Sequence, residues 1–301
     1  MRHAEKKGTK GARRMLQVCC TVLALALLAL YVLMPAGVGV FALMRHPSDV
    51  GAPPDGFQAV QIPATDGVEL AAWSHPGVNG AAILVLHGAT SSREEIRPIA
   101  SALAASGYSV LAPDLRGHGE SGGRGVPAYG WHGTEDVKAC LAWIEKRENP
   151  ASIGGYGSSL GGEILLGASS DCPAMAAVVA DGATYRCLSD YLVLPANRHL
   201  WHSFTTRVLF AAIGGFGGED EPKRLVDAMA DAAGTSFLLI EAGNVAREAA
   251  YGSMMAASAP DRAQQWLIPG VSHVGGYGAN PKEYEKRVIE FFGEHLHAPG
   301  E

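Results

Sequence analysis

Gly155-Tyr156-Gly157-Ser158-Ser159-Leu160-Gly161-Gly162 is preceded by the β-like run 151–153 and followed by a helix-like run at 163–168. Within it, Gly157-x-Ser159-x-Gly161 has the spacing of a sharp strand-to-helix turn, which pushes the serine hydroxyl out above the sheet. The glycines are needed because a Cβ at either position would collide with the turn. Ordinary Gly/Ser loops match this spacing by chance, so the rest of the chain must decide the role of Ser159.

Apolar segments of strand length alternate with helical segments on both sides of this turn. Buried strands that alternate with helices indicate βαβ units and a mostly parallel sheet, here of about eight strands flanked by helices. In such α/β sheets, functional groups gather at the carboxyl ends of the strands. The expected strands are a hairpin at 58–62 and 68–73, then 81–86, 108–112, 153–156, 174–180, 237–240 and 265–268, and the clearest helices are 94–106, 134–146 and 281–295.

The composition excludes several classes of function. The 301 residues are 48% hydrophobic and 18% charged with a net charge of −6, and no basic run is interleaved with aromatics in the body of the chain. We therefore expect no nucleic-acid partner. The sequence has no His or Cys cluster with metal-ligand spacing and no phosphate loop, so we also expect no metal and no other cofactor.

The N-terminal region predicts a membrane anchor. Residues 15–44 are almost entirely apolar, and residues 1–14 before them are rich in Lys and Arg. About 20 such residues cross a bilayer as a helix, and the charge bias predicts a cytoplasmic N-terminal tail and an extracytoplasmic body. The alternative is a cleaved signal peptide, whose apolar region is normally shorter, roughly 7–15 residues. Residues 45–56 are expected to be a linker, and 57–301 the folded domain.

One long stretch interrupts the alternation of strands and helices. About 182–235 separates two expected strands by far more than a usual crossover. We expect a small helical insertion there that covers the carboxyl edge of the sheet as a lid. The run Gly214–Gly218 within it follows no expected strand, which favours a hinge or loop over a nucleotide-binding turn.

The motifs now resemble those of a known superfamily. The chain resembles an α/β-hydrolase over about Phe57 to Leu296, and is most similar to the serine-aminopeptidase-like and lysophospholipase-like branch, which includes membrane-anchored bacterial esterases. The motifs that carry this resemblance are His87-Gly88, Asp114-Leu115-Arg116-Gly117-His118-Gly119-Glu120-Ser121, the Ser159 turn and Ser272-His273.

The resemblance implies the main parts of an acyl-transfer site. Ser159 would be the nucleophile and His273, shortly after the strand 265–268, its base. His118 is a rival by residue type, but in similar chains this segment shapes a loop. The oxyanion hole would use the backbone N–H groups of Leu160, after the nucleophile, and Ala89, after the strand 81–86.

The acid that orients His273 is harder to choose, because the family usually has an aspartate after the strand that is here 237–240. This chain has Glu241 at the strand end and Glu248 in the following loop. Asp181 follows the preceding strand, so all three remain candidates, with Glu248 preferred because it lies past the turn. Three aspartates precede their nearest strands and belong at the opposite edge: Asp227, Asp231 and Asp261.

We therefore predict a membrane-anchored serine hydrolase of the carboxylesterase or lipase type, acting on a small-molecule ester or other acyl substrate, favoured to be hydrophobic. The near alternative is an aminopeptidase that acts on small peptides. From a different class, the missing aspartate suggests a catalytically impaired hydrolase-fold binding protein. Covalent labelling of Ser159 by a fluorophosphonate separates an enzyme from such a binder.

Overall fold

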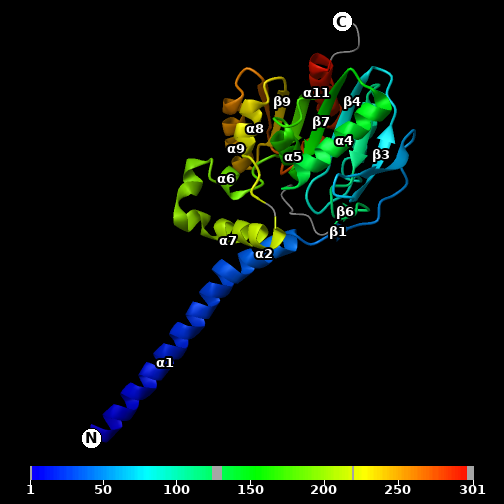
Figure 1. Cartoon of the computed structure of the whole chain (residues 1–301). Helices are drawn as coiled ribbons and strands as arrows, with labels where there is room; N and C mark the ends of the chain where they lie inside the picture. The colour runs from blue at the N-terminus through cyan, green and yellow to red at the C-terminus, as the bar shows by residue number, and fades with distance from the viewer. Residues whose placement is uncertain (1, 124–130, 219, 297–301) are drawn as a thin grey trace.

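A single large sheet organises the domain that follows the N-terminal helix in this computed structural model (Figure 1). Among the described residues it has eight strands in the order β10-β9-β8-β7-β4-β5-β3-β2. The hairpin strands β2 and β3 are antiparallel and the others are parallel, which confirms the predicted α/β sheet. The strands are β2 (Gln58–Pro63), β3 (Glu69–His75), β4 (Ala81–Leu86), β5 (Ser109–Pro113), β7 (Ser152–Ser158), β8 (Met175–Asp181), β9 (Ser236–Ala242) and β10 (Ala263–Ile268).

The structure describes residues 2–123, 131–218 and 220–296. Residues 1 and 297–301, the ends of the predicted tail and folded domain, therefore lie outside the described residues, as does position 219 of the predicted insertion.

Two helical layers cover the sheet. On one face, α4 (Gly133–Glu148), α5 (Leu160–Ala168), α8 (Leu225–Asp231) and α9 (Ala246–Ser258) contribute to one apolar cluster. On the other, α3 (Arg97–Ala105) and α11 (Pro281–His295) pack into a second cluster. The short α10 (Gly276–Ala279) precedes α11. The predicted helix at 94–106 begins only at Arg97, next to Pro98, a residue that fits the first turn of a helix.

The predicted insertion is mainly helical. It contains α6 (Leu188–Tyr191), the 3₁₀ turn η2 (Pro195–Arg198) and α7 (Leu200–Gly217), whereas α8 at its end packs against α5 and α9. The prediction of a hinge or loop at the glycine run was wrong, because Gly214–Gly217 forms the last turn of α7. Gly218 then ends the helix with a left-handed φ of 75°, which glycine adopts without strain.

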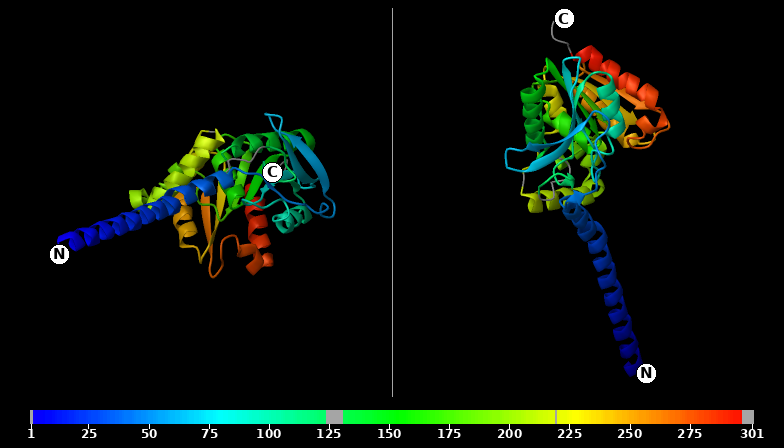
Figure 2. Two further views of the ribbon diagram at one scale, coloured as in Figure 1. Left: turned by 90° about the horizontal axis from the view of Figure 1, so that it is seen from below. Right: turned by 90° about the vertical axis from the view of Figure 1, so that its right-hand side faces the viewer.

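The apolar N-terminal segment forms one long helical rod that leaves the domain (Figures 1 and 2). It comprises α1 (Arg2–Leu28), the π-helical turn η1 (Ala29–Leu33) and α2 (Met34–Ala42). The part from Arg13 to Ala42 is long and apolar enough to cross a membrane, a property that signal sequences share. Its last turns, in α2, pack against α7. Within the predicted linker, β1 (His46–Pro47) pairs with β6 (His118–Gly119).

Candidate active site

Ser159 occupies a strained turn between β7 and α5. Its φ of 48° and ψ of −115° lie outside the regions that L-residues favour, at a cost of about 1–3 kcal/mol that the surrounding fold must offset. A Cβ added to Gly157 would lie 2.3 Å from the backbone of Gly161. One added to Gly161 would lie 2.5 Å from the carbonyl oxygen of Leu86. The predicted need for both glycines is therefore confirmed.

Ser159, His273 and Glu248 form a hydrogen-bonded chain at the carboxyl edge of the sheet. His273 follows β10, and its Nε2 lies 2.9 Å from Ser159 Oγ. Its Nδ1 lies 2.6 Å from Oε1 of Glu248, a buried residue in the first turn of α9. The other oxygen, Oε2, accepts a hydrogen bond from the backbone N–H of Ala242 at 2.8 Å. With Nδ1–H donating to Glu248, the lone pair of Nε2 faces the Ser159 hydroxyl.

The surroundings of His273 favour its protonated form. The hydrogen bond to Glu248 raises the pKa of His273, an effect that partial burial of the ring opposes without cancelling. The ring packs closely on Gly182, where a Cβ would lie 2.9 Å from it. The chain at Gly182 also has a positive φ of 71°. A glycine after β8 therefore gives the imidazole room to reach Ser159.

Asp181 supports the turn through its backbone. Its carbonyl oxygen accepts a hydrogen bond from the N–H of Ser159 at 2.6 Å. Its side chain accepts one from the hydroxyl of Tyr284 at 2.7 Å, and that hydroxyl lies 2.9 Å from the hydroxyl of Tyr156. Burial raises the pKa of the Asp181 carboxyl to about 7. The side chain thus bonds a tyrosine behind the turn, not His273.

Glu241 is also occupied elsewhere. In β9 its carboxylate accepts a hydrogen bond from Nε2 of Gln265 at 3.0 Å. It lies so close to α9 that a Cβ on Gly252 would overlap it. Burial raises its pKa. Of the three acids considered from the sequence, Glu248 is therefore the one within hydrogen-bond distance of His273.

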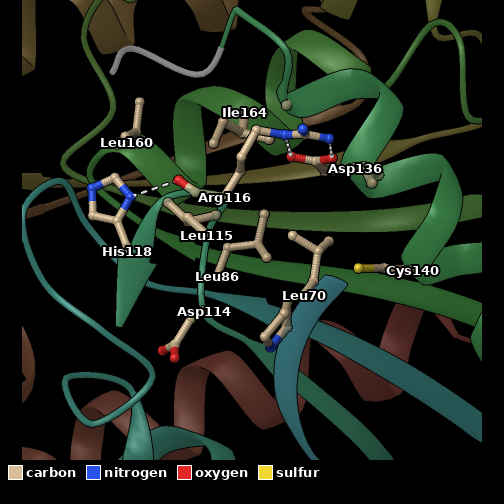
Figure 3. A pocket seen from close by; sticks show the side chains of 13 residues that line it. Leu70, Leu86, Asp114, Leu115, Arg116, His118, Asp136, Cys140, Leu160 and Ile164 are labelled. Carbon is tan, nitrogen blue, oxygen red and sulfur yellow. Dashed lines mark hydrogen bonds and ion pairs between the residues drawn. The ribbon is translucent and has the colours of Figure 1, made fainter. Parts of the chain in front are cut away.

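His118, the rival histidine, belongs to a different cavity. Its Nδ1–H donates to the carbonyl oxygen of Arg116 at 3.0 Å, as Figure 3 shows. Burial lowers its pKa to about 4, so it is neutral at ordinary pH. The small cavity beside it has a volume of about 20 Å³ and is walled largely by apolar side chains such as Leu70 and Ile164.

A larger cavity, with a volume of about 480 Å³, opens over Ser159. Ala89, after β4, and Leu160, after the serine, both line it. Leu160 is the first residue of α5, so its N–H has no partner within the helix. Thr184 and Tyr185, after β8, contribute another wall.

Sequence reasoning missed one contributor to this cavity. Val38, Phe41 and Ala42 of α2 line it together with Ser159 and His273. They belong to the segment that hydropathy assigns to the membrane. The small residues near them, such as Gly39, were the available signal, because small residues allow a helix to approach a neighbour closely.

No group of three or more His, Cys, Asp or Glu side chains that could hold a metal ion occurs in residues 2–123, 131–218 and 220–296.

The chain is similar to several known proteins. Residues 78–221, which include β4, the loop after it and the Ser159 turn, match the family described as serine aminopeptidase, S33. The Pyrococcus furiosus esterase Pf2001 superposes with a TM-score of 0.65 at 23% identity, over 83% of this chain and 99% of that one. A thermophilic esterase from Thermogutta terrifontis gives a TM-score of 0.57 at 18% identity, over 80% of this chain and 100% of that one.

The chain has the α/β-hydrolase fold. At these identities the likeness to the solved esterases concerns the fold alone.

Curated relatives match shorter parts of the chain. An uncharacterized protein of Mycobacterium tuberculosis strain H37Rv is 33% identical over 129 residues, which are 40% of this chain and 43% of that protein. An uncharacterized 31.7 kDa protein of Escherichia coli, from the traX–finO intergenic region, is 36% identical over 94 residues, which are 29% of this chain and 32% of that protein. The chain thus spans less than half the length of these relatives.

Proposed function

We propose that this α/β-hydrolase is a serine hydrolase that cleaves an ester through an acyl-enzyme on Ser159. The observation that carries the proposal is the hydrogen-bonded chain Ser159–His273–Glu248, with both contacts of the imidazole within 3 Å: 2.9 Å to Ser159 and 2.6 Å to Glu248. A free serine hydroxyl is a poor nucleophile, and a base within hydrogen-bond reach activates it. Glu248 holds the imidazole in the tautomer that can accept the proton.

Acylation then proceeds as follows. Ser159 Oγ attacks the ester carbonyl carbon while its proton passes to Nε2 of His273. The N–H groups of Ala89 and Leu160 stabilise the oxyanion, a contribution of roughly 3–4 kcal/mol for one donor in other systems. His273 gives the proton to the departing alcohol, and water activated by the same imidazole hydrolyses the acyl-enzyme.

The polar lining of the cavity favours an ester over a peptide with a free amino terminus. An aminopeptidase site needs a carboxylate free to receive the substrate ammonium group. Apart from Glu248, the acid among the lining residues that the structure describes is Glu163. Its Oε1 accepts hydrogen bonds from the N–H groups of Thr184 and Tyr185 at 2.9 and 3.0 Å, and burial raises its pKa to about 7. Arg247 on the same wall would repel an ammonium group.

The N-terminal helix is proposed to be a retained anchor, with the basic tail in the cytoplasm and the hydrolase domain outside. The Lys and Arg residues before the apolar segment support this orientation. Retention is supported by the packing of α2 against α7, which cleavage near residue 40 would remove.

Hydrolysis of a short p-nitrophenyl ester by the full-length protein tests the function. We expect activity in the wild type and none above background in Ser159→Ala. Full activity in that variant would overturn the proposal. Folded wild-type protein that neither hydrolyses the ester nor reacts with a fluorophosphonate would instead support the binding-protein alternative.

A further inference from the structure

The α2 helix is docked closely on the insertion of the hydrolase domain. Pro35 and Gly39 are buried against α7. A Cβ on Gly39 would lie 2.7 Å from the backbone carbonyl oxygen of Leu209 in α7, whereas one on Gly37 would meet nothing within 4 Å. Figures 1 and 2 show the consequence, with α1 projecting away from the domain directly beyond this contact. The end of the rod is therefore part of the folded domain.

A second contact holds the other end of α2. The ring of Phe41 meets His46 edge to face, with centroids 5.2 Å apart. His46 begins β1, which pairs with β6, and its ring lies 5.2 Å from that of His118. The helix is thus fixed both by α7 and by the loop region that follows β5.

The same helix, α2, also faces the cavity over Ser159. Val38, Phe41 and Ala42 line that cavity. Val38 and Phe41 remain 46% and 56% exposed, so apolar surface is left uncovered next to the nucleophile. An acyl chain laid against it would be stabilised by about 25 cal/mol for each Å² removed from water.

The same helix continues from this wall into the segment that can span a membrane. Residues 15–33, which are apolar except for Gln17 and Thr21, approach the length of roughly 20 residues needed for the hydrocarbon core. At about 1.5 Å per residue, Val38 lies less than two turns beyond them. The cavity therefore lies beside the point where the helix would leave the bilayer.

We propose that α2 forms the acyl-binding wall of the Ser159 cavity, and that this wall receives the acyl chain of an amphiphilic ester directly from the bilayer. The inference rests on the proposed serine hydrolase function. It makes the membrane helix a component of the substrate site as well as a tether. A water-soluble ester that enters the cavity from the aqueous side would not contact this wall. The test below separates entry from the bilayer from entry from water.

The test compares two alkyl fluorophosphonates, one with an ethyl and one with a dodecyl chain, on the full-length protein in phosphatidylcholine vesicles. Ser159 Oγ forms a bond to phosphorus, the P–F bond breaks, fluoride leaves, and the serine proton passes to His273. Each labelling rate is measured for the wild type, Val38→Trp and the matched control Val40→Trp. Val40 lies on the same helix but outside the cavity lining.

We expect Val38→Trp to lower the dodecyl-to-ethyl ratio of rate constants by about tenfold, since removing one methylene of contact in an apolar pocket has at least this effect. Val40→Trp should keep the wild-type ratio. Wild-type rate constants for both probes in both variants, or an equal fall of the ratio in both, would overturn the inference while leaving the labelled Ser159 and the proposed function intact. Absence of labelling by either probe in folded wild-type protein would overturn both.

If Val38→Trp slows both probes equally, Phe41→Ala decides the question. Shortening this side chain removes apolar wall without filling the cavity. A selective fall in the dodecyl rate supports the acyl-binding wall, and an unchanged ratio contradicts it.

Discussion

The turn that carries Ser159 and the segments that surround it are built differently. The turn is local, because one run of residues supplies strand, serine and helix, and close backbone contacts at Gly157 and Gly161 hold it. The outer part is assembled from distant segments, with Glu248 from α9, His273 from the loop after β10 and the cavity wall from α2. Under the proposed function, the turn sets where the chemistry takes place, while the outer part sets how well the serine is activated and what reaches it.

Removing the nucleophile should have the largest effect. Ser159→Ala should lower kcat for a p-nitrophenyl ester by about a millionfold, as in other serine hydrolases. The neighbouring Ser158→Ala is a matched control, because its hydroxyl donates to Glu95 at 2.6 Å and Ser158 lines a different cavity from the one over Ser159. It should retain activity within about tenfold, a structural effect only. Comparable losses in both would make the turn, not Ser159, the essential feature.

Removing the charge of Glu248 should have the next largest effect. Glu248→Gln should lower kcat by about 10⁴, the loss seen when the acid of another triad is made neutral. Asp181→Asn and Glu241→Gln change buried carboxyls whose partners are Tyr284 and Gln265. Steady-state kinetics should find each within about tenfold of wild type. If one of these two shows the large loss, it replaces Glu248 as the acid.

The pH dependence of kcat/KM should report the hydrogen bond between His273 and Glu248. His273 serves as a base only when neutral, and the hydrogen bond to Glu248 raises its pKa. The acid limb of kcat/KM should therefore lie above the ordinary histidine value of about 6.5. In Glu248→Gln the limb should move to lower pH, measured on the residual activity. A limb that does not move would mean that Glu248 does not control this titration.

The smallest effect concerns the docking of α2. Gly39→Ala places a Cβ against α7 and should lower the free energy of unfolding by about 1–3 kcal/mol, the usual cost of overpacking. Gly37→Ala meets open space and should be neutral or stabilising by up to about 1 kcal/mol, because alanine favours a helix. Thermal unfolding of the full-length protein in detergent gives the two shifts in Tm. Equal shifts would show that α2 does not pack on α7.

Much of the sheet and of the Ser159 turn could be predicted from the sequence. The Ser159 turn and the strands around it follow from local spacing and apolar runs, and α11 begins and ends where its pattern predicts. The placement of His273 followed from its position just after a strand. The acid that orients His273 could not be chosen from sheet topology alone. The topology brings Glu241, Glu248 and Asp181 to one edge without showing which side chain turns towards the imidazole.

The docking of α2 could not be predicted from hydropathy, for a physical reason. Hydropathy is the same whether an apolar residue faces lipid or another helix. The hydropathy of residues 15–44 therefore does not distinguish a membrane-spanning part from a part that packs on the domain. In the structure, the close approach of Gly39 to Leu209 distinguishes the docked part from the free part. The glycine run at the end of α7 was predicted to be a hinge or loop because glycine has a weak helix propensity. In the structure these glycines are helical, so the surrounding fold overrides that propensity.

The hydrogen bond from His273 to Glu248 orients the imidazole towards Ser159, and proton NMR of the full-length protein in detergent tests it most directly. A proton held in a short, charge-assisted hydrogen bond to a carboxylate is strongly deshielded. At a pH below the acid limb, the account predicts a downfield Nδ1 proton resonance that is lost in His273→Ala and Glu248→Gln and kept in Asp181→Asn and Glu241→Gln. A resonance that survives in Glu248→Gln, or that disappears in Asp181→Asn, would contradict it.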